Sequence, residues 1–153
     1  MSSKTIRTVL FDLDGTLLDT APDLAYALNQ VLREEGREAL PFDAIRPVVS
    51  HGGKALIETG FAITEDDPEF GRLRQRLLDI YRDNLALHTR LFPGMDEVLH
   101  FLEGRDMPWG VVTNKPEHLT LPLLDALGLA ARSACTISGD SLPVRKPDPG
   151  PLL

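Results

Sequence analysis

The chain has 153 residues, with 16 Lys and Arg against 23 Asp and Glu, and therefore a net charge of −7. Its 42% hydrophobic and 25% charged residues exclude a disordered chain and fit one domain, or one domain with an insert. No apolar run is long enough for a membrane span, the acidic balance argues against nucleic-acid binding, and Cys135 has no second cysteine to pair with. We expect a cytoplasmic protein, monomeric or homodimeric, without nucleic-acid or membrane partners.

Three short apolar segments, 5–11, 109–112 and 134–138, predict buried β-strands. Helix-compatible stretches follow the first two. Strands that alternate with helices indicate parallel βαβ units. The predicted fold class is therefore α/β, with a Rossmann-like parallel sheet.

The long segment between the first two strands reads as helices only. One helix begins after Thr20 as its cap, carries Pro22 in its first turn and ends at Gly36. Further helices are expected at 53–58 and 68–85. We interpret 19–88 as an inserted helical domain, with 1–18 and 89–153 forming the α/β core.

Two helices are expected in the second half of the core. The first uses Met95, Val98, Leu99 and Leu102 as its buried face. The second is expected to begin near residue 121 with residue 120 as its cap, because the proline at 122 would break a helix that started earlier.

The strongest chemical signal is the run Asp12-Leu13-Asp14-Gly15-Thr16, directly after the first predicted strand. Ligands of open α/β sheets bind at the carboxyl ends of strands. One Asp can act as a covalent nucleophile, and a second can serve as general acid and then general base. An ordinary Asp-Gly turn is the alternative, but two carboxylates at a strand end favour a catalytic site.

This run resembles the first motif, D-x-D-G-T, of the haloacid dehalogenase (HAD) superfamily. The resemblance implies that Asp12 is the nucleophile and Asp14 the acid/base, and that the Asp12 side chain and the Asp14 backbone carbonyl bind Mg²⁺. Dehalogenases of the family lack the second Asp, so Asp14 favours phosphate chemistry. We also place Gly15 and Thr16 at the substrate.

Two later positions match the second and third family motifs. Thr113 follows the second strand, where a hydroxyl and backbone N–H groups can bind phosphate, with Asn114 beside it at the substrate. Lys146, next to a proline, can neutralise the nucleophile and the transferring phosphoryl group. Taken alone, Thr113 could be a strand-terminal turn or helix cap, and Lys146 a solvated loop residue.

The fourth family motif, an acidic pair after one more strand, is absent. Asp140 resembles it but precedes Lys146, and we interpret it as a loop residue. In the family's sheet the strand bearing that motif lies beside the first strand, so we expect segment 5–11 to be an exposed apolar edge. We therefore expect the chain to be a fragment or a truncated product.

The helical insert occupies the place of the family's cap, which closes over the site and selects the substrate. Lys54 could meet an anionic group there, although an exposed lysine at a helix start is an equal alternative. Segments 12–20, 112–116 and 139–147 resemble the phosphoglycolate phosphatase branch, with N-acetylmuramic acid 6-phosphate phosphatases equally close. The expected function is Mg²⁺-dependent hydrolysis of a small phosphorylated metabolite, with 2-phosphoglycolate as the first candidate. A sugar phosphomutase, or a non-catalytic fragment or binding protein, stays an alternative.

Overall fold

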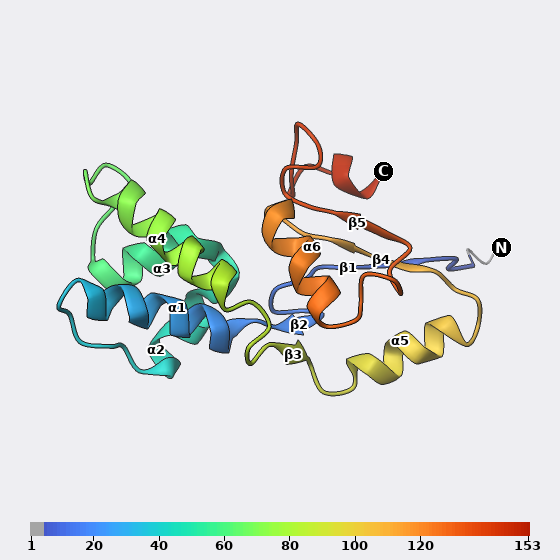
Figure 1. Ribbon diagram of the computed structural model, residues 1–153. Helices are drawn as coiled ribbons and strands as arrows, with labels where there is room; N and C mark the ends of the chain where they lie inside the picture. The colour runs from blue at the N-terminus through green and yellow to red at the C-terminus, as the bar shows by residue number, and fades with distance from the viewer. Residues whose placement is uncertain (1–4) are drawn as a thin grey trace. The chain divides into compact units, whose positions relative to one another are not determined.

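The computed structural model describes residues 5–153, and the chain divides into two compact units (Figure 1). Unit 1 comprises residues up to Leu18 together with Leu91–Leu153, and unit 2 comprises Asp19–Arg90. The chain leaves unit 1 through β2 (Leu18–Asp19) and returns through β3 (Arg90–Leu91), and these two segments form a two-stranded sheet. No helix within residues 5–153 is both long and apolar enough to cross a membrane.

The core of unit 1 is a parallel three-stranded sheet in the order β1-β4-β5. Its strands are β1 (Val9–Phe11), β4 (Trp109–Val112) and β5 (Cys135–Ile137). Phe11 pairs with Val111, and Val112 pairs with Ile137. The α/β class and the parallel sheet predicted from the sequence are confirmed, and the register brings the carboxyl ends of all three strands to one edge.

The first strand is shorter than predicted, because pairing with β4 begins only at Val9 and Trp109. Pro108 precedes β4 and has no N–H for a ladder, although its carbonyl accepts hydrogen bonds from Val9 N and Thr8 Oγ1. β1 lies at an edge of this sheet, as expected, and Leu10 on it is 38% exposed.

Two helices of unit 1 differ from expectation. In α5 (Met95–Glu103) Leu99 and Leu102 are buried, but Val98 is exposed, because it lies on the flank of the helix beside the exposed Phe101. The next helix, α6 (Glu117–Ala126), runs through Pro122 rather than beginning near residue 121. Its start is stabilised from a distance, since the Asp140 carboxylate accepts the Glu117 N–H at 2.8 Å. The chain ends in a short 3₁₀ helix, η2 (Gly150–Leu152).

Unit 2 is helical, as predicted. It contains α1 (Ala21–Glu34), α2 (Phe42–Ile45), the 3₁₀ helix η1 (Arg46–His51), α3 (Gly52–Phe61) and α4 (Phe70–Asp83). The α3 helix is longer than expected, and α2 and η1 lack a clear apolar period in the sequence. Thr20 precedes α1, but it is the Asp19 carboxylate that accepts the Ala21 N–H.

Helices α1 and α4 pack side by side through apolar stripes (Figure 1). The buried side chains of these stripes are Leu24, Leu28, Val31, Leu32, Phe70, Leu73, Leu77 and Ile80. Gly60 of α3 allows close packing on α1, because a Cβ there would meet Leu28. Most of the stability of these helices therefore comes from packing of amphipathic faces.

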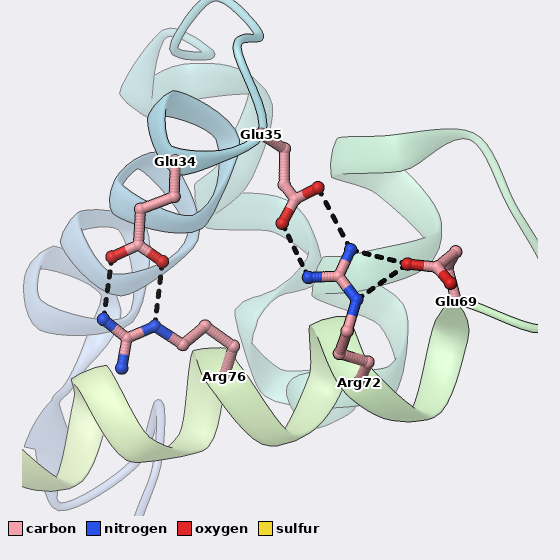
Figure 2. Close-up of polar contacts among 5 residues, drawn as sticks. All are labelled: Glu34, Glu35, Glu69, Arg72 and Arg76. Carbon is pink, nitrogen blue, oxygen red and sulfur yellow. Dashed lines mark hydrogen bonds and ion pairs between the residues drawn. The ribbon is translucent and has the colours of Figure 1, made fainter.

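Ion pairs close the exposed rim of the α1–α4 contact (Figure 2). Glu34 accepts two hydrogen bonds from Arg76, both at 2.8 Å. Glu35 accepts two from Arg72, at 2.7 and 3.0 Å, and Arg72 also pairs with Glu69. The hydrogen bonds from Arg76 and Arg72 lower the pKa of Glu34 and of Glu35.

These lowered pKa values predict an acid-sensitive contribution to stability. A carboxylate whose pKa is lower in the folded state contributes fully above its unfolded pKa of about 4.3 and loses that contribution as the pH falls through the folded value. The double variant Glu34→Gln/Glu35→Gln should have a slightly lower Tm than the parent chain at pH 7, and the gap should close by about pH 3. Circular dichroism melts across pH 3–7 measure this, with exposed Glu97→Gln on α5 as control. A gap that stays constant with pH contradicts the prediction.

A buried carboxylate anchors the return segment of unit 2. Asp23, in the first turn of α1, is fully buried and accepts hydrogen bonds from His88 N–H, Thr89 N–H and Thr89 Oγ1 at 2.8–3.0 Å. Buried carboxylates are tolerated only when such bonds replace water. Asp23 thus ties the segment before β3 to the helix that follows β2.

Replacing this carboxylate should therefore be costly. Asp23→Asn keeps the shape but removes the charge and one acceptor oxygen, so the free energy of unfolding should fall by about 1–3 kcal/mol. Urea unfolding measures the loss, and exposed Asp66→Asn in the same unit should change stability by less than about 0.5 kcal/mol. Equal effects of the two substitutions would reject an anchoring role for Asp23.

Candidate functional site

The turn after β1 carries the carboxylates of Asp12 and Asp14 and leaves both partly exposed. Leu13 is fully buried and its carbonyl accepts the N–H groups of Leu17 and Leu18, so the turn is folded onto the core. Gly15 has φ +77° and donates its N–H to the Leu18 carbonyl at 2.9 Å, a conformation that favours glycine. The Asp12 and Asp14 side chains are 48% and 20% exposed. Gly15 therefore shapes the turn that presents both carboxylates.

Lys146 lies beside the predicted nucleophile. Its Nζ is 3.0 Å from Asp12 Oδ1 and donates a hydrogen bond to the Val112 carbonyl at 2.8 Å. The Leu13 N–H donates a hydrogen bond to the same oxygen at 2.7 Å. Lys146 and Leu13 therefore both contact Asp12 Oδ1, and neither of these two contacts involves Oδ2. The loop that carries Lys146 is held in turn by Asn114, whose amide donates to the Lys146 carbonyl at 2.9 Å. The structure thus brings Asp12 and Lys146 together, with Asn114 as support.

Thr113 stands at the carboxyl end of β4, nearly buried. Its N–H continues the sheet by donating to the Ile137 carbonyl at 2.9 Å, and its Oγ1 accepts the Lys115 N–H at 3.1 Å. Thr16 lies exposed in the turn after β1, with its N–H bonded to the Leu13 carbonyl. Thr113 therefore lies at the end of β4, and Thr16 in the turn that follows the neighbouring strand β1.

Lys115 is a further charged group at this edge that the motif comparison did not single out. Its Nζ lies 3.0 Å from Asp14 Oδ1, and its side chain is 7% exposed. The available signal was its position two residues after Thr113, at a strand end. The site therefore pairs each carboxylate with an ammonium group: Asp12 with Lys146, and Asp14 with Lys115.

The turn after β5 packs against this site. Gly139 donates its N–H to the Lys115 carbonyl at 2.9 Å, and Asp140 lies in the loop and caps α6. The hydroxyl of Ser138 is buried, and its Oγ has no hydrogen-bond partner within residues 5–153. Gly139 lies so close to the Asn114 backbone that an added Cβ would overlap the Asn114 carbonyl. Two turns of the site are thus in direct backbone contact.

Lys54 belongs to unit 2 and is ion-paired there. Its Nζ lies 2.5 Å from Glu65 Oε1 and 3.8 Å from Glu58 Oε1 on α3. The hydrogen bond to Glu65 raises the pKa of Lys54. Its ammonium is therefore engaged by carboxylates within its own unit.

The oxygen donors of the turn suit a hard cation. Among residues 5–153 no group of three or more His, Cys, Asp or Glu side chains is arranged to hold a metal ion. Mg²⁺ is commonly bound by one or two carboxylates, with waters and substrate phosphate completing the octahedron. The carboxylates of Asp12 and Asp14 supply that kind of incomplete oxygen set.

A family model described as haloacid dehalogenase-like hydrolase matches residues 9–153. The chain belongs to this family. It is 45% identical over 148 residues to an N-acetylmuramic acid 6-phosphate phosphatase of Pseudomonas putida, covering 97% of this chain and 66% of that protein. It is 44% identical over 147 residues to a phosphoglycolate phosphatase of Xanthomonas campestris pv. campestris, covering 96% of this chain and 66% of the relative.

A structural match to a solved protein agrees with this family assignment. A predicted phosphoglycolate phosphatase from Haemophilus somnus matches with a TM-score of 0.82 at 28% identity, over 98% of this chain and 70% of that chain. The chain spans about two thirds of the length of the curated relatives it matches.

The contact between the two site turns predicts a sensitive glycine. Gly139→Ala would force the Asn114 carbonyl away and should lower the free energy of unfolding by about 1–3 kcal/mol. Gly71→Ala, on α4 with nothing near an added Cβ, should raise stability by up to about 1 kcal/mol as a matched control. Urea denaturation distinguishes them, and changes of the same sign would contradict the packing argument.

Proposed function

We propose that this chain carries the catalytic residues of a phosphomonoester hydrolase that works through an aspartyl-phosphate intermediate. The observation that carries the proposal is the contact of Lys146 with Asp12 Oδ1 at 3.0 Å, with Asp14 two residues away. A carboxylate beside a fixed ammonium group is suited to attack a dianionic phosphate ester, because the cation offsets the repulsion between the two anions. Family membership and the names of the relatives support the same chemistry.

The proposed reaction has two steps. A carboxylate oxygen of Asp12 attacks phosphorus, the ester P–O bond breaks, and the Asp14 carboxyl gives its proton to the departing oxygen. Asp14, now ionised, takes a proton from a water molecule, which attacks the aspartyl phosphate and releases inorganic phosphate and the Asp12 carboxylate. Lys146 and Thr113 bind the phosphoryl oxygens in both steps.

The divalent cation of the proposed reaction is Mg²⁺. The Asp12 side chain and the Asp14 backbone carbonyl would hold it, and when bound it neutralises charge on the phosphoryl group. The oxygen-only donor chemistry of the turn supports this choice over softer metals. Lys146 and the strand-end N–H groups bind and orient the phosphate alongside it.

Unit 2 is proposed to be the cap that selects the substrate, with Lys54 as a candidate contact for an anionic substrate group. Its position between the Asp12 turn and Thr113 in the chain supports this role. A cap excludes water from the first step and admits only esters that fit beneath it.

The proposed substrate is a small phosphorylated metabolite, with 2-phosphoglycolate first. A second candidate is N-acetylmuramic acid 6-phosphate, because a relative that matches at 45% identity is named as a phosphatase of that ester.

A sugar phosphomutase would use the same two carboxylates but return the phosphoryl group to a sugar. A non-catalytic binding protein would have no need for the matched carboxylate and ammonium pairs at one sheet edge.

Substitution of the nucleophile tests the reaction. Asp12→Asn should lower phosphate release from 2-phosphoglycolate in Mg²⁺ buffer by at least about 1,000-fold, because an amide cannot form the phosphoenzyme. Phosphate release is measured across a panel of esters that includes both candidates. Arg105→Gln, on the surface next to α5, should leave the rate within about twofold. Equal release by the parent chain and Asp12→Asn, or release from no ester, would reject the proposal.

A further inference from the structure

Lys115 is a charged group that the proposed reaction does not use, and the surrounding chain holds it firmly. Its N–H donates to Thr113 Oγ1 at 3.1 Å, and its carbonyl accepts hydrogen bonds from Gly139 N–H at 2.9 Å and Thr120 Oγ1 at 3.2 Å. These contacts come from the end of β4, the turn after β5 and the first turns of α6. The backbone from which the side chain extends is therefore fixed on three sides.

The ammonium group of Lys115 is directed at Asp14, whereas that of Lys146 is directed at Asp12. Both Nζ–Oδ1 distances are 3.0 Å. In the proposed function, on which this inference rests, Asp12 meets phosphorus and Asp14 meets the departing oxygen. On that function, the two lysines lie toward opposite ends of the ester, Lys146 beside the phosphoryl group and Lys115 beside the leaving group.

Distance limits which part of the substrate Lys115 can reach. To receive a proton from Asp14, the departing oxygen must come within about 2.8 Å of that carboxyl group. With Asp14 Oδ1 as the proton donor, the departing oxygen then lies within about 6 Å of Lys115 Nζ, given the 3.0 Å between Nζ and Asp14 Oδ1. From there, a group on the carbon that bears this oxygen can turn toward the ammonium and form an ion pair with it.

We propose that Lys115 determines specificity by binding a carboxylate on the carbon next to the ester oxygen. The substrate class is then the phosphate esters of α-hydroxy acids, of which 2-phosphoglycolate is the smallest. Such a substrate brings a third carboxylate next to those of Asp12 and Asp14. The Lys115 ammonium offsets the repulsion between the substrate carboxylate and Asp14. A sugar 6-phosphate has no carboxylate on the carbon next to its ester oxygen and would not use this contact.

The inference is tested by binding, separately from turnover. In the Asp12→Asn chain, which cannot form the phosphoenzyme, affinity for 2-phosphoglycolate and for ethyl phosphate is measured by calorimetry with Mg²⁺ present. The two esters differ only in that ethyl phosphate has a methyl group in place of the carboxylate. Adding Lys115→Met should weaken 2-phosphoglycolate binding about 10-fold or more and ethyl phosphate binding less than about threefold.

Variants keep this test independent of folding. Lys115→Arg retains the charge and should keep the preference for 2-phosphoglycolate, whereas Lys115→Gln should lose it as Lys115→Met does. Circular dichroism compares the fold of each variant with that of the parent. Equal loss for both esters, or no preference for 2-phosphoglycolate before Lys115 is changed, would overturn the assignment. Selective loss without any phosphate release by the parent chain would reject the proposed function and leave the Lys115 contact standing.

Discussion

Lys146 contacts two atoms at once, the Val112 carbonyl at 2.8 Å and Asp12 Oδ1 at 3.0 Å. This double contact joins the loop after β5 to the end of β4 and to the turn after β1. It requires the three strands to end at one edge, which the parallel register provides. A shift of one residue in either pairing would turn alternate side chains to the other face and separate the lysine from the carboxylate. The site therefore depends on sheet register as much as on the residues themselves.

The turns around the site support one another through backbone contacts. Gly139 N–H bonds the Lys115 carbonyl, the Asn114 amide bonds the Lys146 carbonyl, and Asp140 caps the first turn of α6. Each links a segment after β4 with one after β5. Charged groups on turns that are joined by such hydrogen bonds lose little conformational entropy when a ligand binds. Their positions relative to a ligand are therefore well defined.

In unit 2, different kinds of interaction stabilise different parts of the structure. Apolar stripes join α1 to α4, ion pairs of Arg72 and Arg76 close the exposed rim (Figure 2), and the buried Asp23 anchors the segment before β3. Exposed ion pairs contribute little each, whereas a buried carboxylate with several donors is costly to disturb. The segment of unit 2 that leads into β3 is thus held by the buried Asp23, the polar contact that is costliest to disturb.

Local pattern was sufficient for the α/β class, the β4 strand, the helices α1 and α4, and the run from Asp12 to Thr16, because strand composition, helical period and turn residues act over a few neighbouring positions. It was insufficient where a distant group intervenes. Pro122 argued against a helix start that Asp140 stabilises from 23 residues away. The prediction for Val98 was wrong for another reason, since this residue lies exposed on the flank of α5. The pairing of Lys115 with Asp14 joins positions 101 residues apart in the chain. Such contacts follow from the register of parallel strands, which no local pattern encodes.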